Sequence, residues 1–76
     1  MDKALVLLTL EPKSERAVLD KLRQLKVVTE AHFLYGPYDA YVLIEGKTSA
    51  DLHDLVIDHV RQIEGIVSTM TCFIAN

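Results

Sequence analysis

The residues best suited to chemistry form a short segment, Gly36-Pro37-Tyr38-Asp39, between two apolar runs near the middle of the chain. Pro37 presets the φ angle of the second turn position, and Gly36 accepts backbone angles that are closed to other residues. Asp39 can bond to the local backbone and still offer a carboxylate lone pair. The segment therefore predicts a tight turn between two strands that also presents backbone amides and an acid.

Three hydroxyl residues near the end of the chain, Ser68, Thr69 and Thr71, extend this polar set. Backbone amides can hold a carboxylate, and an aspartate can hold an ammonium group. A turn with free amides, Asp39 and nearby hydroxyls is therefore suited to a zwitterion. The simpler alternative is a hairpin connection with no ligand, and the residues alone leave both interpretations open.

The three histidines and the single cysteine form no metal-binding or catalytic pattern. His53 and His59 lie six residues apart on one expected helix, about 240° around its axis, so they cannot share a ligand face. We expect His59, which falls among apolar positions, at the edge of the core or in an interface, whereas His32 stays open as a ligand contact. Cys72 has no Cys-x-x-Cys partner and no helix N-terminus beside it, and we expect a small buried hydrophobe.

No other group of residues indicates an enzyme. The sequence has no glycine-rich phosphate loop, no nucleophile elbow and no paired catalytic constellation. Asp51, Asp54 and Asp58 form an acidic edge on the second expected helix, but Arg61 lies one turn beyond Asp58 and can balance its charge. We therefore expect no catalytic activity, no metal and no cofactor.

The elements that would position these residues follow from the hydrophobic pattern. Strands are expected at 3–10, 27–35, 40–45 and 66–75, and helices at 14–26 and 49–64, with Ser14 and Ser49 as N-caps and Gly65 as the stop of the second helix. The order β-α-β-β-α-β predicts an α+β, ferredoxin-like domain over residues 1–76. Two right-handed crossovers would place both helices on one face of a four-stranded antiparallel sheet.

Composition limits the partners of the chain. A formal net charge of −3 and the lack of any run of Lys or Arg argue against nucleic-acid binding. The longest apolar stretch is far shorter than the roughly 20 residues of a membrane span, and one cysteine without a signal peptide fits the cytoplasm. On the first expected helix, acids interleave with the bases, and we expect a solvated mixed-charge face: Lys13, Glu15, Arg16, Asp20, Lys21, Arg23 and Lys26.

The strands are apolar on both faces, although helices can cover only one face. In the first strand, Leu5 and Leu7 oppose Val6 and Leu8, and the third strand repeats this pattern. A large exposed apolar surface is uncommon in a soluble monomer, and burying it contributes on the order of 25 cal/mol per Å². We therefore expect a homodimer that associates through the uncovered sheet face.

Two segments resemble the ligand-binding domain of the Lrp/AsnC transcription regulators, the RAM (regulation of amino acid metabolism) domain. Residues 35–42, Tyr-Gly-Pro-Tyr-Asp-Ala-Tyr-Val, are similar to the hairpin motif of that domain. Residues 63–71 are similar to its helix-to-strand segment, in which a glycine and an aliphatic pair precede a threonine-rich strand. Together with the order of elements, the resemblance covers essentially the whole chain.

The resemblance implies a domain that dimerises through its sheet, often assembles four dimers into an octameric ring, and binds amino-acid effectors between dimers. Because no helix-turn-helix precedes the first strand, we expect no direct DNA binding. Indirect action on transcription or metabolism, for example by co-assembly with a full-length relative, would follow. The ligand contacts implied by the resemblance are Gly36, Pro37, Tyr38, Asp39, Ser68, Thr69 and Thr71.

Two other functions remain open from the sequence. A small dimeric α+β barrel enzyme, of the monooxygenase or isomerase kind, would use His32 and either Tyr35 or Tyr38 as acid-base residues. Its substrate cavity would lie inside one protomer, whereas a polar crevice between dimers at the central turn would favour amino-acid sensing. A purely structural partner domain would bind no small molecule.

Overall fold

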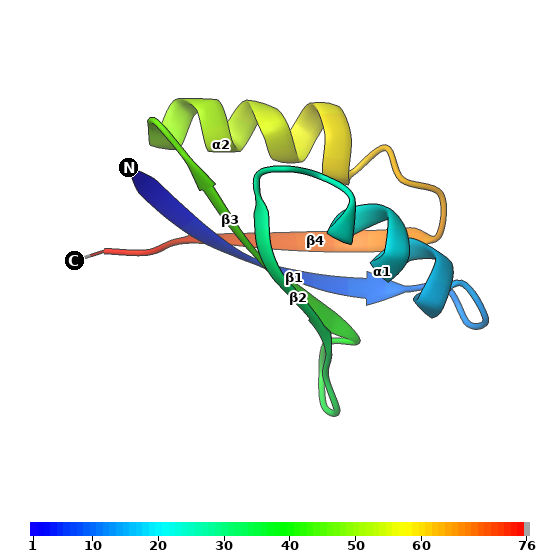
Figure 1. Ribbon diagram of the computed structural model, residues 1–76. Coiled ribbons are helices and arrows are strands. Elements are labelled where there is room, and N and C mark those ends of the chain that lie inside the picture. The colour runs from blue at the N-terminus through cyan, green and yellow to red at the C-terminus, as the bar shows by residue number, and fades with distance from the viewer. Residues whose placement is uncertain (76) are drawn as a thin grey trace.

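The computed structural model describes residues 1–75 and contains a four-stranded antiparallel sheet with both helices on one face (Figure 1). The strand order β2-β3-β1-β4 places β1 and β3 in the centre and β2 and β4 at the edges. The predicted β-α-β-β-α-β arrangement is therefore confirmed. The elements are β1 (Asp2–Leu10), α1 (Glu15–Arg23), β2 (Val28–Phe33), β3 (Ala40–Gly46), α2 (Ser49–Leu55), the π-helical turn η1 (Val56–Val60) and β4 (Ile66–Phe73).

The core lies between the helices and one face of the sheet. Alternate residues of β1 and β3 point into it, because successive side chains of a strand face opposite sides. Helix α1 covers this face near β2, and α2 covers it over β1 and β3. The fully buried large side chains come from both layers: Val6, Leu8, Val18, Leu19, Leu22, Val42, Ile44, Leu52 and Val60.

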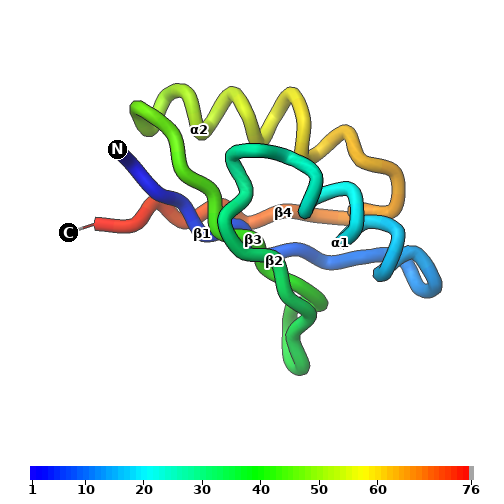
Figure 2. Tube along the Cα trace, viewed as in Figure 1, coloured from blue at the N-terminus to red at the C-terminus, as the bar shows by residue number. Residues whose placement is uncertain are grey.

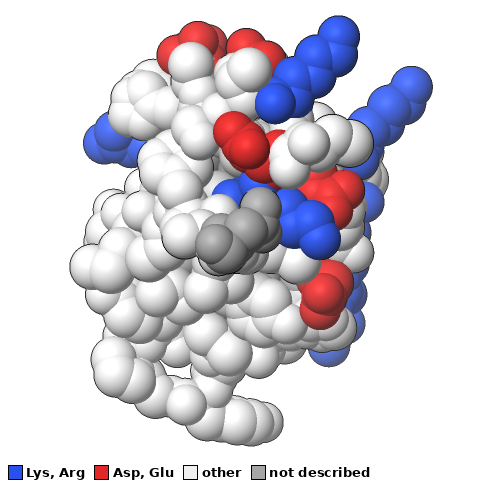
Figure 3. Space-filling view, turned by 90° about the vertical axis from the view of Figure 1, so that its left-hand side faces the viewer, with Lys and Arg blue, Asp and Glu red and all other residues white. Residues whose placement is uncertain are grey.

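The opposite face of the sheet, which we call the open face, is covered by no helix of residues 1–75. Leu5, Leu7 and Leu43 are half-buried there, and Met70 of β4 is 49% exposed. Cys72 belongs to the same face and is exposed, so the expectation of a buried cysteine is wrong for the single chain. Charged side chains gather over the helices and along one flank, whereas a broad uncharged surface reaches down to a projecting loop (Figure 3).

The second helix departs from a regular α-helix. Leu52, Val56 and Val60 are spaced by four and all face the core. On an ideal α-helix, that spacing rotates successive side chains by about 40°, so the third would begin to leave the core. The wider turn η1 offsets this drift, with the amide of Arg61 donating to the Val56 carbonyl five residues earlier at 2.9 Å. The single helix predicted for 49–64 is thus an α-helix followed by a π-helical turn.

The helix N-caps also differ in detail from the prediction. Thr48, not Ser49, caps α2, because its hydroxyl accepts a hydrogen bond from the Asp51 amide at 3.1 Å. Ser49 is the first helical residue, and its hydroxyl donates to Asp2 at 3.1 Å. Ser14 does occupy the N-cap position of α1, but its side chain makes no capping hydrogen bond.

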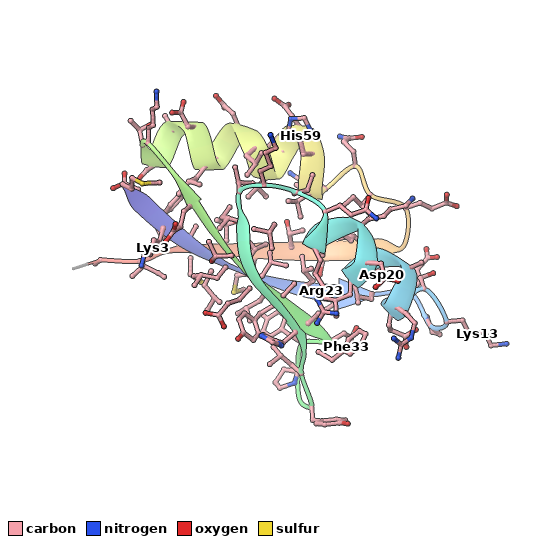
Figure 4. All side chains as sticks on the ribbon, viewed as in Figure 1. Lys3, Lys13, Asp20, Arg23, Phe33 and His59 are labelled. Carbon is pink, nitrogen blue, oxygen red and sulfur yellow. The ribbon has the colours of Figure 1, made fainter. Side chains whose placement is uncertain are left out.

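Arg23 has a structural contact in place of the solvated role that we predicted for it. Its Nε and Nη2 atoms donate to the Ala31 carbonyl of β2 at 3.2 and 2.7 Å (Figure 4). Because β2 is an edge strand, this contact occupies a carbonyl that could otherwise pair with another chain. The guanidinium therefore joins α1 to the sheet and protects one of the two sheet edges.

Gly65, directly before β4, packs closely against the start of α1. It has a φ of +103°, and a Cβ at this position would lie 2.8 Å from both the Ser14 Cβ and the Val18 Cγ2. Its carbonyl accepts the Glu11 amide at 2.8 Å. The sequence suggested a helix stop here, and the structure adds a close packing contact that requires the absence of a side chain.

We expect Gly65→Ala to lower the free energy of unfolding more than Gly36→Ala does, by about 1–3 kcal/mol, measured by urea denaturation. Both glycines have a positive φ, but a Cβ on Gly36 would meet nothing within 4 Å. The comparison therefore separates the cost of the Cβ clash from the cost of a positive φ in a residue other than glycine. Equal losses for the two variants would contradict the packing role of Gly65.

Candidate functional site

The candidate site is centred on the loop of residues 34–39, which connects β2 to β3. The loop projects from the sheet on the side opposite the helices (Figures 1 and 2). Gly36 has a φ of +143°, which confirms the need for glycine at this point. The connection is longer than the tight turn that we predicted, because β2 ends at Phe33 and not at Tyr35.

Asp39 fixes the base of this loop through three hydrogen bonds. Its carboxylate Oδ2 accepts the Leu10 amide at 2.7 Å, and its own amide donates to the Leu8 carbonyl at 2.8 Å. Its carbonyl accepts the Leu34 amide at 2.9 Å. The side chain thus continues the pairing of β1 beyond the start of β3. Within residues 1–75, no hydrogen bond engages the second carboxylate oxygen, Oδ1.

The two tyrosines of the loop have different surroundings. Tyr38 is half-buried, and its hydroxyl lies 3.3 Å from the Met70 sulfur on the open face. Tyr35 is fully exposed. Beside the loop lies a hollow of about 300 Å³, which we call the loop hollow, lined by Glu15, Phe33, Leu34, Tyr35 and Asp39. It combines two carboxylates with an apolar and aromatic wall, which suits a cation with an apolar part.

The predicted hydroxyl contacts lie on two different faces of β4. Ser68 pairs with Thr9 across the sheet, and the two hydroxyls are hydrogen-bonded on the open face. Thr69 pairs with Leu8 and therefore lies on the helix face, as does Thr71 two residues later. Successive side chains of any strand point to opposite faces of the sheet, so adjacent residues such as Ser68 and Thr69 are separated.

The hydroxyls also lie away from the loop hollow. Ala40 and Thr69 pair with Leu8 from opposite sides, so their strands are about 10 Å apart, two strand spacings. Ser68 and Thr69 line a separate hollow of about 340 Å³, which we call the β4 hollow, together with Arg61, Ile66 and Val67. The structure thus brings Asp39 and these hydroxyls to the same end of the sheet but not into one pocket.

Arg61 is the residue of this region that sequence reasoning did not select. We expected it to balance Asp58, but the ion pairs of residues 1–75 are Lys3–Glu45 and His32–Glu30. Its position one residue after η1 places it beside the start of β4. Only the length of the connection from helix to strand could have indicated this proximity.

His32 belongs to a polar cluster on the open face. Its Nε2 lies 3.7 Å from Glu30 Oε1, and its ring is 5.6 Å from that of Tyr41. The Tyr41 hydroxyl donates to the same Glu30 oxygen at 3.2 Å. Desolvation of the phenol, followed by the Glu30 charge and hydrogen bond, raises the pKa of Tyr41 above its ordinary value. His32 does not converge with Tyr35 or Tyr38 on a common cavity.

The remaining histidines are exposed. His59 points away from the sheet (Figure 4), so it does not lie at the edge of the core, and its other expected place, an interface, stays a prediction. His53 also lies on the exposed side of α2. Among residues 1–75, no three His, Cys, Asp or Glu side chains are grouped as metal ligands. No helix in this range is long and apolar enough to cross a membrane.

We expect Asp39→Ala to lower the free energy of unfolding by about 1–3 kcal/mol, because the Leu10 amide would lose its acceptor in a partly buried position. Asp39→Asn keeps an acceptor oxygen and should lose less. Urea denaturation of both variants checks this order, with Asp20→Ala on the exposed face of α1 as the control. An Ala variant as stable as the wild type would contradict the anchoring role.

Comparisons with known proteins agree with this fold. A curated relative, an uncharacterized HTH-type transcriptional regulator from Pyrococcus furiosus, is 29% identical over 73 residues, which are 96% of this chain and 49% of the relative. The chain spans about half the length of the curated relatives that it matches. The crystal structure of FFRP-DM1 is 32% identical, with a TM-score of 0.94 over 99% of this chain and 100% of that chain.

A transcriptional regulator from Neisseria meningitidis, solved as a complex with L-Met, shares the fold at 16% identity, with a TM-score of 0.88 over 99% of this chain and 50% of its own. The family model of the Lrp/AsnC ligand binding domain matches residues 3–76. The chain therefore belongs to the Lrp/AsnC ligand-binding domain family, as the two sequence segments had indicated.

Proposed function

We propose that this domain binds an amino-acid effector and acts, without catalysis or direct DNA contact, on transcription or amino-acid metabolism in the cytoplasm. Membership of the Lrp/AsnC ligand-binding family supports a regulatory role, and the curated relatives are HTH-type transcriptional regulators. The complex of the Neisseria regulator with L-Met supports the ligand class. The observation that carries the proposal is the anchored Asp39 carboxylate beside an apolar and aromatic wall.

In this proposal, the loop hollow receives the ammonium end of the effector. Asp39 is held by backbone hydrogen bonds, so its orientation is set before a ligand arrives. Its Oδ1 atom is free among the described residues and can accept an ammonium hydrogen. Gly36, Pro37 and Tyr38 would shape the wall around the ligand.

Ser68, Thr69 and Thr71 enter this proposal through a neighbouring copy. Within one chain, β1 separates these residues from Asp39. A second protomer that brings its β4 hollow to the loop would complete a pocket with carboxylates on one side and hydroxyls on the other. Ligand binding would then depend on assembly, and assembly on ligand, as two linked equilibria.

The open face supports the proposal that the basic unit is a homodimer. Leu5, Leu7 and Leu43 form its centre, and the Lys3–Glu45 ion pair and the His32–Glu30–Tyr41 cluster lie at its margins. An apolar centre with a polar rim is the usual composition of an interface between subunits. We extend the proposal to a ring of four dimers, and to co-assembly with full-length Lrp/AsnC regulators through the same face.

The enzyme alternative has less support. Its acid-base candidates are His32, Tyr35 and Tyr38, and they point to different surroundings: the Glu30 carboxylate, the solvent and the Met70 sulfur. Groups that transfer a proton to one substrate must lie within hydrogen-bonding reach of it. This dispersal favours a binding domain over a catalytic one.

Calorimetric titration of the wild-type protein with the twenty amino acids tests the proposal. We expect heat from at least one of them. That amino acid should bind Asp39→Asn at least about tenfold more weakly than the wild type, because its ammonium group loses a charged partner. The Asn variant is the appropriate one, since it retains an acceptor for the Leu10 amide.

No heat from any amino acid, together with unchanged thermal midpoints, would exclude effector binding and favour a purely structural partner domain. Heat from the wild type with equal affinity for Asp39→Asn would exclude the role of Asp39 but retain the effector.

A further inference from the structure

We infer that the β4 hollow is a carboxylate-binding subsite and that Arg61 is its determinant. The inference rests on the proposed effector function, because it assigns the acidic end of the effector to this hollow. Arg61 lies outside the two sequence segments that indicated the family, residues 35–42 and 63–71.

The first support is the chemistry of the lining residues. Arg61, Ser68 and Thr69 supply a guanidinium and two hydroxyls, while Ile66 and Val67 supply an apolar wall. No carboxylate lines the hollow. A guanidinium can donate two parallel hydrogen bonds to a carboxylate, and this bidentate geometry is stronger and more specific than a single contact.

The second support is the free edge of β4. The Ile74 amide donates to the carbonyl of Lys3, the residue opposite it in the register, which makes Lys3–Ile74 a hydrogen-bonded pair of the ladder. Counting along the register, Leu7–Met70 is also such a pair, whereas Leu8–Thr69 is not. The backbone amide of Thr69 therefore points away from β1, toward the outer edge, where β4 has no neighbouring strand.

An edge amide beside a guanidinium is a second donor for the same anion. The opposite edge differs, because Arg23 already occupies the Ala31 carbonyl of β2. On the β4 side, neither of the two ion pairs of residues 1–75 includes Arg61, and its side chain donates no hydrogen bond in this range. The Arg61 guanidinium is thus available to a ligand, whereas the Ser68 hydroxyl already bonds that of Thr9.

The third support is complementarity between the two hollows. The loop hollow contains Glu15 and Asp39 and favours a cation, whereas the only charged residue that lines the β4 hollow is Arg61, which favours an anion. An amino acid carries both charges. A volume of about 340 Å³ is enough for its carboxylate and part of its side chain. The β4 hollow of one copy would hold the α-carboxylate while the loop of another holds the ammonium.

The test compares ligand carboxylates with their amides on matched variants. Each amino acid that binds the wild type is titrated alongside its C-terminal amide, against wild type, Arg61→Gln, Arg61→Lys and the control Arg16→Gln. Arg16 is exposed on α1 and carries the same charge change. Amide nitrogen NMR of the labelled protein follows the Thr69 signal in parallel.

We expect the wild type and Arg16→Gln to prefer the acid over the amide by at least tenfold. Arg61→Gln should reduce this preference to less than threefold, because the variant lacks the guanidinium that would pair with the ligand carboxylate. Arg61→Lys should retain part of it through charge alone. The NMR signal of the Thr69 backbone amide should shift when the amino acid is added and should not shift when its C-terminal amide is added.

An acid-to-amide preference that is unchanged in Arg61→Gln would overturn the inference while leaving effector binding and the role of Asp39 intact. A change in assembly mass for Arg61→Gln without a change in preference would also overturn it, since Arg61 would then pair with an acid of a neighbouring copy. If no amino acid binds the wild type, both the inference and the proposed function are wrong.

Discussion

The uncovered apolar face of the sheet is the constraint on which the rest of the structure depends. Two helices are enough to cover one face, and Leu8, Val42 and Ile44 are fully buried beneath them. The alternation of a strand then places Leu5, Leu7 and Leu43 on the other face, where no element of the described chain covers them. A domain of this size buries only about 60% of its unfolded surface, so a second layer from another copy would add substantial stability.

The same alternation explains why the candidate site is divided. Asp39 lies at the base of a loop that projects past the open face, while Thr69 lies on the helix face at the far side of β1. Backbone pairing fixes both positions firmly, so neither can move to meet the other within one chain. A pocket that uses both must therefore be built from more than one protomer, and binding would be coupled to assembly.

Much of the fold could be predicted from the sequence, because hydrophobic periodicity reports directly on which side chains face the core. The order of elements, the alternation in β1 and the glycine requirement at Gly36 were all confirmed. Errors arose where a tertiary contact decides the outcome. Arg23 left the expected solvated face because an edge carbonyl of β2 lies within its reach. Cys72 was expected inside, but its face has no cover in the single chain.

The site was harder to predict than the fold. From the sequence we expected the Asp39 side chain to bond the local backbone, whereas its carboxylate accepts the amide of Leu10 on β1, 29 residues away in the chain. Arg61 was assigned to Asp58 because the two are neighbours on a helix, whereas the turn η1 brings it beside β4. Such proximities depend on the angle at which a helix meets a strand, which residue spacing does not record.

Sedimentation equilibrium of the purified chain at micromolar concentration shows whether the open face holds two copies together. We expect a mass of at least twice the 8.6 kDa of the single chain. A charge placed at the centre of the open face, Leu7→Lys, should reduce this mass toward that of the monomer. A wild-type chain that sediments at 8.6 kDa would contradict the claim that the open face is an interface.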